Sequence, residues 1–159
     1  MGDIQIVSFD VGFAPDFARL NYEWIDQYFR VEDHDREMLD DPAHYIINEG
    51  GEIFFALAHN RVVGTVAMIR DGDDRFELAK MAVSPDHKGI GIGDRLMTTC
   101  IDFACRKGKS SIFLLSNTKL VPAINLYKKH GFVEVKMDEQ TPYERVNIRM
   151  ELALGRRKM

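Results

Sequence analysis

Three glycines at alternating positions form the part of the chain best suited to binding an anion. They alternate with two isoleucines over residues 89–93, between a strand-like segment and a helix-like segment. Glycine lets backbone N–H groups turn toward a ligand without an intervening side chain. The start of a helix adds unpaired N–H groups and a partial positive charge. Such an arrangement most often holds a phosphate, with an ordinary tight loop as the alternative.

The spacing of these glycines excludes two common phosphate-binding motifs. The P-loop string G-x-x-x-x-G-K-[ST] does not occur in the chain, and the residue three after Gly91 is Asp94 rather than the last glycine of a dinucleotide fingerprint. A kinase-like domain is excluded as well, because its lysine and metal-ligand motifs are missing. What remains is a basic residue, Lys88, followed by the pattern G-x-G-x-G.

This pattern resembles motif A of the GNAT superfamily of N-acetyltransferases, usually written [RQ]-x-x-G-x-[GA]. Lys88 stands where that family prefers Arg or Gln, which keeps the charge but loses the planar fork of hydrogen-bond donors. A second segment, residues 123–132, matches A-x-x-x-Y-x-x-x-G-[FY] and resembles motif B of the same family. Two motifs in the family's order are more specific than one. The resemblance is strong from Arg61 to Val135.

The resemblance implies acetyl-CoA as the cofactor. In the family, the diphosphate lies at the glycine-rich loop, and the pantetheine arm lies between two parted strands, here residues 76–83 and 111–116. Main-chain groups of the first strand bond the arm, and one N–H is the expected donor to the oxyanion of acyl transfer. The implied cofactor contacts are Met81, Ala82, Val83, Lys88, Gly89, Ile90, Gly91, Ile92, Gly93, Asp94, Asn117, Tyr127 and Lys128.

Some of these contacts have structural alternatives. The family's usual Asn lies three residues before the motif B alanine, where this chain has Leu120, so Asn117 departs from the spacing. A loop-capping role is its alternative. Lys128 also suits a solvated helix position. Asp94 suits the positive end of a helix without any ligand and is mildly adverse to a diphosphate.

Two side chains are suited to moving the protons of acyl transfer to an amine. A free alkylamine has a pKa of about 10.4, so a base is needed near neutral pH. Glu77 lies at the position that often holds this base in the family, with a solvent-facing strand carboxylate as the alternative. Tyr127 lies where motif B often places a tyrosine near the thioester sulfur, and its phenol can protonate a departing thiolate. An ordinary packing tyrosine is the alternative there.

The implied acceptor site is less specific. Trp24, Tyr28, Phe29 and Glu32 lie where the first helices of the family wall the amine pocket, and Arg145 or Arg149 on the expected last strand suits a carboxylate. Core packing of the aromatic residues and a cross-strand ion pair of Arg145 are the alternatives. The acceptor is expected to be a small-molecule amine or a protein amine. A non-catalytic acyl-CoA-binding sensor is the competing function.

Lys80 interrupts the apolar alternation of the strand over residues 76–83. A lysine at this point indicates either a bulge in the strand or an amine that faces the site. The sequence leaves both interpretations open.

The composition predicts a single enzyme-sized domain over residues 1–159. Of the 159 residues, 45% are hydrophobic, which is enough for a proper core. The net charge of −4 predicts no nucleic-acid partner, and the basic cluster is only Arg156-Arg157-Lys158. With no apolar run long enough for a membrane and no secretory signal, we expect a cytoplasmic protein. The histidines lack metal-ligand spacing, and the terminal strands would allow pairing into a homodimer.

The elements that must position these residues predict a mixed α/β (α+β) fold. Hydrophobic periodicity indicates strands at 3–9, 52–58, 61–70, 76–83, 111–116, 132–137 and 144–152, and helices at 15–29, 33–39, 92–107 and 120–129. Turns are expected at His59-Asn60 and Thr141-Pro142. The order β-α-α-β-β-β-α-β-α-β-β is the one that the resemblance implies: a GNAT-like, mostly antiparallel sheet with helices on both faces.

Overall fold

Seven strands form one sheet in the computed structural model, which describes residues 3–137 and 143–155. The strands are β1 (Ile4–Ser8), β2 (Glu52–Ala58), β3 (Arg61–Asp71), β4 (Arg75–Val83), β5 (Ser111–Ser116), β6 (Val133–Val135) and β7 (Ile148–Ala153). Their order across the sheet is β1-β2-β3-β4-β5-β7-β6. Every neighbouring pair is antiparallel except β4 and β5, so the mixed, mostly antiparallel sheet is confirmed.

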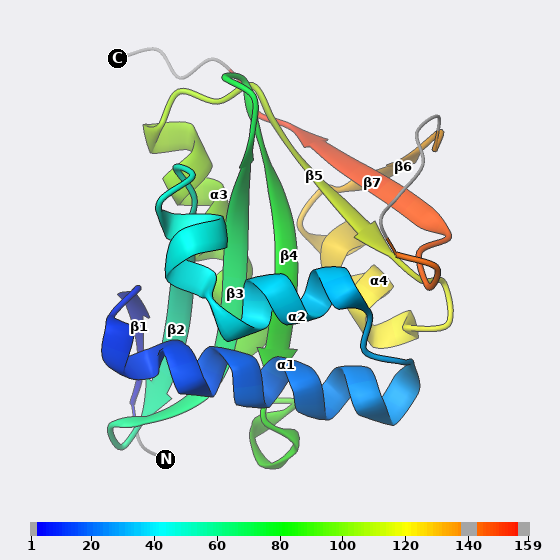
Figure 1. Cartoon of the computed structure of the whole chain (residues 1–159). Helices are drawn as coiled ribbons and strands as arrows, with labels where there is room; N and C mark the ends of the chain where they lie inside the picture. The colour runs from blue at the N-terminus through cyan, green and yellow to red at the C-terminus, as the bar shows by residue number, and fades with distance from the viewer. Residues whose placement is uncertain (1–2, 138–142, 156–159) are drawn as a thin grey trace.

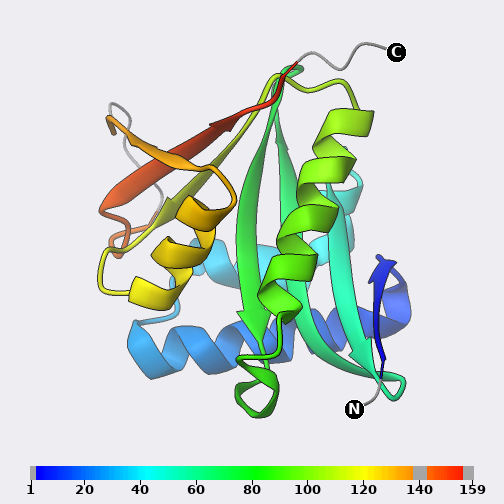
Figure 2. The same cartoon turned by 180° about the vertical axis from the view of Figure 1, so that it is seen from behind.

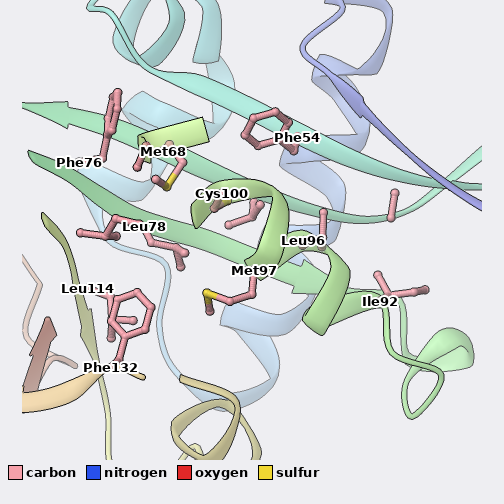
Figure 3. Packing of buried hydrophobic residues seen from close by; sticks show 14 of the residues in the cluster. Phe54, Met68, Phe76, Leu78, Ile92, Leu96, Met97, Cys100, Leu114 and Phe132 are labelled. Carbon is pink, nitrogen blue, oxygen red and sulfur yellow. The ribbon is translucent and has the colours of Figure 1, made fainter. Parts of the chain in front are cut away.

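Helices cover both faces of this sheet (Figures 1 and 2). They are α1 (Ala14–Tyr28) and α2 (Asp33–Asp40) on one face, and α3 (Ile92–Arg106) and α4 (Val121–Lys129) on the other. Apolar residues at helical spacing give each long helix one buried stripe. α1 buries Phe17 and Ile25 in the first core. α3 buries Leu96, Met97 and Cys100 in the second, where they face the strands in Figure 3.

The two parallel strands, β4 and β5, are paired at one end only. Their partners are Arg75 with Ser111, Phe76 with Ile112, and Glu77 with Phe113. Beyond these pairs each strand continues along its antiparallel neighbour, β4 along β3 and β5 along β7. The strands therefore diverge, as Figure 1 shows between the labels β4 and β5. This is the parting that the resemblance implied.

A bulge interrupts β4 just after the point of divergence. Between the pairs Thr65–Ala82 and Ala67–Ala79, β4 carries one residue more than β3. Lys80 lies in this bulge with a φ of 56°, in the left-handed region that side chains other than glycine rarely adopt. The bulge interpretation of Lys80 is thus confirmed.

The sequence predicted the order of strands and helices correctly but misplaced some of their ends. The strand expected over residues 144–152 begins only at Ile148, so Arg145 does not lie on a strand. The backbone before β7 is held elsewhere, because the Glu144 amide donates to Glu32 Oε1 at 3.0 Å. β6 is likewise shorter than the predicted strand over 132–137. The Thr141-Pro142 turn and the basic cluster at 156–158 lie outside the described residues.

Two absences hold for the described part of the chain. None of its helices combines the length and the apolar character needed to cross a membrane. Nor do three or more His, Cys, Asp or Glu side chains in residues 3–137 and 143–155 gather where they could hold a metal ion.

Candidate active site

A cavity of about 600 Å³ lies where β4 and β5 part. Residues 77–83 of β4 and residues 115–117 at the end of β5 form its two sides. Trp24 and Tyr28 of α1 also line it, as do Leu126 and Tyr127 of α4. Because α1 and α4 lie on opposite faces of the sheet, the cavity reaches through the gap from one face to the other.

Most of the predicted site residues line this cavity. They are Trp24, Tyr28, Glu77, Met81, Ala82, Val83, Lys88, Gly89, Gly91, Gly93, Asp94, Asn117, Tyr127 and Arg145. Glu32, Ile90, Ile92 and Lys128 are not among the lining residues. The Ile92 side chain is buried in the core and that of Ile90 is exposed, so main-chain groups are what these two offer a ligand. Phe29, expected beside Trp24 and Tyr28, lines the cavity too, whereas the sequence missed His87 and Lys119, which also line it.

The glycine-rich loop presents backbone amides at the start of α3. Gly91 precedes the helix with a φ of 88°, a conformation that favours glycine. The Arg95 amide donates to the Gly91 carbonyl at 3.1 Å, which leaves the amides of residues 92–94 without a partner inside the helix. Gly64 on β3 lets this end of α3 approach closely, since a Cβ there would lie 2.9 Å from Ile92 Cγ2. An anion at this point would meet free amides and the positive end of the helix.

Asp94, in the first turn of α3, is paired with residues at the end of α4. Its Oδ1 accepts a hydrogen bond from Lys129 Nζ at 2.9 Å and lies 2.8 Å from His130 Nε2. Hydrogen bonds with Lys129 and His130 lower the pKa of the Asp94 carboxyl. The pairing joins the two helices and offsets a negative charge that would otherwise oppose a diphosphate at the loop.

Glu77 is the last residue of β4 that pairs with β5, and it lines the cavity where the strands part. In the part of the chain that the structure describes, its carboxylate makes no hydrogen bond. Burial raises the pKa of Glu77 to about 7, although Lys80 opposes this effect. Near neutral pH such a carboxyl readily exchanges a proton, which is the property that a general base requires.

Tyr127 approaches the cavity from α4. Its ring lies 6.2 Å from that of Phe132, centroid to centroid, and within the described ranges its hydroxyl has no hydrogen-bond partner. Burial raises the pKa of Tyr127 to about 12. The phenol therefore stays protonated at neutral pH.

Asn117 lines the cavity, but both ends of its side-chain amide are bonded to protein. Nδ2 donates to the Arg145 carbonyl at 2.7 Å, and Oδ1 accepts from the Lys119 amide at 2.9 Å. This is the loop-capping arrangement that the sequence left open. Lys119 Nζ in turn donates to the Tyr28 carbonyl at 3.1 Å and lies 4.3 Å from the Phe29 ring centroid. The loop after β5 is thereby fastened to the end of α1.

The predicted acceptor residues fall into two groups. Trp24 and Tyr28 form part of the cavity wall. Glu32 and Arg145 instead pair with each other at 3.2 Å, and Arg145 also donates both of its terminal nitrogens to Asp35, at 2.7 and 2.8 Å. The ion pair of Arg145 thus reaches α2 rather than crossing strands. Its guanidinium is already occupied by protein carboxylates, which gives no support to the predicted contact with an acceptor carboxylate.

Sequence reasoning did not single out Asp35 or Tyr143, which meet Lys80 beside the cavity. Lys80 Nζ donates to Asp35 Oδ1 at 2.5 Å and to Tyr143 Oη at 2.9 Å. Lys80 also lines the cavity, so it is both a bulge residue and an amine beside the site. A signal for Asp35 was present in its position three residues after Glu32, where the two residues form a capping box at the start of α2.

A mixed sheet that parts at its parallel pair, with a glycine-rich helix start on one side of the gap and a carboxylate within it, is the arrangement that the resemblance to the GNAT family implied. The sequence profile of the acetyltransferase (GNAT) family matches residues 18–132, and the chain belongs to this family.

Individual relatives agree with this assignment. The Xenopus tropicalis protein named "Probable N-acetyltransferase camello" is 31% identical over 105 residues, which are 65% of this chain and 48% of that protein. The chain thus spans about half the length of this curated relative. A GNAT-family acetyltransferase from Staphylococcus aureus superposes with a TM-score of 0.87 at 21% identity, over 96% of this chain and 100% of that chain. The yncA protein of Salmonella typhimurium, in a structure with its cofactor acetyl-CoA, superposes with a TM-score of 0.74 at 19% identity. The match covers 98% of this chain and 96% of the yncA chain.

Proposed function

We propose that the chain is an N-acetyltransferase that transfers an acetyl group from acetyl-CoA to a primary amine. The observation that carries this proposal is the cavity, which joins the amides at the start of α3 to the carboxylate of Glu77 through the gap between β4 and β5. An anion-binding end and a proton-accepting end in one cavity suit a cofactor that carries both a diphosphate and a reactive acyl group. Membership of the acetyltransferase family and the acetyl-CoA bound to yncA support the same choice.

The residues present fit acetyl-CoA. The cavity, at about 600 Å³, is of the size that binds small molecules and cofactors. Lys88 and the amides of residues 92–94 would hold the diphosphate. Beyond Glu77, β4 has no pairing with β5, so the main chain at residues 81–83 is open to bond an extended arm as an added strand would. The cofactor would supply an acetyl group activated as a thioester.

The side chains in the cavity divide the proton transfers between them. Glu77 takes the proton of the acceptor amine, because its carboxyl has no hydrogen-bond partner among residues 3–137 and 143–155 and burial raises its pKa to about 7. Tyr127 donates its hydroxyl proton toward the departing sulfur, since the phenol is protonated at neutral pH. A main-chain N–H at residues 81–83 stabilises the negative charge on the acetyl oxygen. Neither Cys100, which is buried in the core, nor Cys105 lines the cavity, so the amine attacks the thioester without a covalent cysteine intermediate.

The acceptor amine enters from the face covered by α1 and α2. Trp24, Tyr28 and Phe29 form an aromatic wall there. The rings of Trp24 and Phe29 meet edge to face, with centroids 6.2 Å apart, which gives this wall a defined shape. Small-molecule amines and protein amines are both acceptor classes within this proposal.

Release of free thiol from acetyl-CoA tests the proposed function. We expect saturable binding of coenzyme A by calorimetry and thiol release above the acceptor-free rate with at least one member of a panel of small amines, amino acids and peptide amines. Binding without turnover across the panel would favour the non-catalytic acyl-CoA sensor. Absence of binding would contradict both functions.

Gly91→Ala is expected to weaken coenzyme A binding about tenfold. The left-handed φ of 88° costs a residue with a Cβ about 1–2 kcal/mol, and relief of that strain turns the loop amides away from the cavity. A tenfold change in Kd corresponds to about 1.4 kcal/mol and is measurable by isothermal titration.

A matched control for this variant is Gly72→Ala. Gly72 lies in the turn between β3 and β4 with a φ of 69°, and at both positions an added Cβ meets nothing within 4 Å. The two variants should therefore lose similar stability, whereas only Gly91→Ala should lose affinity. An unchanged Kd in Gly91→Ala would exclude the loop from cofactor binding.

A further inference from the structure

The bulge in β4 turns Lys80 toward the face of the sheet that α2 covers. Phe76 and Leu78 point to the opposite face, into the core beneath α3, and strict alternation would send Lys80 with them. The extra residue reverses the alternation, so that Ala82 packs in the core beneath α1. Lys80 therefore shares its face with Glu77.

The ammonium of Lys80 is held in place by two partners from distant parts of the chain. Asp35 on α2 accepts one hydrogen bond, and the hydroxyl of Tyr143 accepts another. The ammonium also lies 4.5 Å from the Tyr143 ring centroid, a cation–π distance. The Lys80 and Asp35 side chains are 4% and 0% exposed. Lysine and aspartate are rarely buried to this extent unless they are paired.

The charges around Lys80 are balanced inside one cluster, formed by Glu32, Asp35, Lys80 and Arg145. Arg145 donates to both acids, and the Glu32 amide donates to Asp35 Oδ2 at 2.9 Å. Two cations and two anions thus join β4, the start of α2 and the segment before β7. Glu77 is not part of this cluster of two cations and two anions. It is a further acid on the face of the sheet that carries Lys80.

We propose that Lys80 is a positioning residue for acyl transfer: held on the bulge by Asp35 and Tyr143, its ammonium stabilises the carboxylate form of Glu77 and keeps that base available at neutral pH. The inference rests on the proposed function, in which Glu77 takes the proton of the amine. An opposite charge nearby favours the charged form of an acid, and Lys80 is the first of the neighbours that counter the effect of burial on the pKa of Glu77.

Other charged groups face Glu77 from β3 and β7. Asp71 at the end of β3 opposes ionisation of Glu77, while Arg149 on β7 favours it. Both are already paired, Asp71 with Arg75, and Arg149 with Glu151 at 3.0 Å.

The groups that face Lys80 set its own protonation. Burial lowers the pKa of Lys80, but the hydrogen-bonded Asp35 carboxylate favours the ammonium form, and Arg145 disfavours it. His34 also stands near, with its ring 5.2 Å from that of Tyr143, and burial followed by Lys80 lowers the pKa of His34. The lowered pKa of His34 favours its neutral form near neutral pH.

Lys80→Met tests this role through the pH dependence of the reaction. Methionine keeps most of the apolar stem and removes the charge. Loss of a nearby positive charge disfavours the Glu77 carboxylate and raises its pKa, so the acid limb of kcat/KM should move up by about one pH unit. The rate should recover at higher pH. A carbon-13 NMR titration of the Glu77 carboxyl, assigned by its absence in Glu77→Gln, should show the same shift without any turnover.

Two further variants keep the test independent of folding. Lys80→Met leaves the buried Asp35 without one partner, whereas Lys80→Met combined with Asp35→Asn removes one charge of each sign and preserves the balance. The double variant should show the same shift in the Glu77 titration. Lys80→Arg restores a cation and should move the acid limb back. Lys107→Met, at an exposed position after α3, is the matched control and should change neither profile.

The outcomes separate the inference from the proposed function. An unchanged Glu77 titration in the folded double variant would overturn the inference. Lys80 would then have a structural role, and its variants would lose activity to the same extent at every pH. If the Glu77 titration shifts and the acid limb of kcat/KM shifts with it, the inference is supported. A shifted titration without a matching change in kcat/KM would support the coupling but remove Glu77 from the role of base, against the proposed function.

Discussion

Glu77→Gln is expected to lower kcat at pH 7 about 100-fold or more while leaving the Kd for acetyl-CoA unchanged. A positioned general base contributes about 10²–10⁴-fold, and glutamine keeps the shape of the side chain but cannot take the proton. The Glu77 carboxylate has no hydrogen bond within the described residues, so its removal breaks no contact of the fold. Thiol release with the preferred amine measures kcat, and calorimetry measures the Kd.

The pH profile gives this prediction a second readout. Because the pKa of Glu77 is raised to about 7, the carboxylate that acts as base prevails above that pH. In the unaltered protein kcat/KM should fall as the pH drops through this value, and Glu77→Gln should lack that limb. Glu134→Gln, at an exposed carboxylate on β6, is the matched control. Normal kcat in Glu77→Gln would show that another group or a water molecule takes the proton.

The fold was predictable wherever local sequence determines local structure. β2 and β5 have the predicted bounds, because each is an apolar run that turn-forming residues delimit. The predicted hairpin across His59-Asn60 is present between β2 and β3, with a positive φ at both turn residues, 51° at His59 and 65° at Asn60. The start of β7 was not predictable, because contacts of residues 144 and 145 with α2 hold the backbone there and leave no local pattern.

The candidate site divides in the same way. The glycine-rich loop and the α4 residues that line the cavity follow from two short motifs, each of which folds as a local unit. The cluster around Lys80 could not be predicted, because Asp35 and Tyr143 lie 45 and 63 residues from Lys80 along the chain. They meet Lys80 only because the bulge turns the Lys80 side chain to the other face of the sheet. What the sequence did carry was a lysine out of place in an apolar strand, a departure from pattern of the kind that often marks a functional site.

Asp35→Ala is expected to destabilise the protein by about 3–5 kcal/mol, because it leaves the buried ammonium of Lys80 and the half-buried guanidinium of Arg145 without their shared carboxylate. Burial alone would raise the pKa of Asp35, but hydrogen bonds with Arg145 and Lys80 lower it to about 2. A lowered pKa means that the ionised form contributes stability above the ordinary value of 3.8 and loses it as the pH falls toward 2. Urea unfolding at neutral and acidic pH should therefore show a penalty that shrinks in acid.

Asp33→Ala is the matched control for Asp35→Ala, because both aspartates lie in the first turn of α2 but only Asp35 is buried. Asp33 also carries an ion pair, with Arg36 at 3.0 Å, but its side chain is fully exposed. Exposed pairs contribute little, so this variant should leave the free energy of unfolding nearly unchanged. If Asp35→Ala cost no more than Asp33→Ala, Lys80 and Arg145 would have found water or other partners. Lys80 would then not be fixed beside Glu77, since the same carboxylate that stabilises the fold is what holds the ammonium on that face of the sheet.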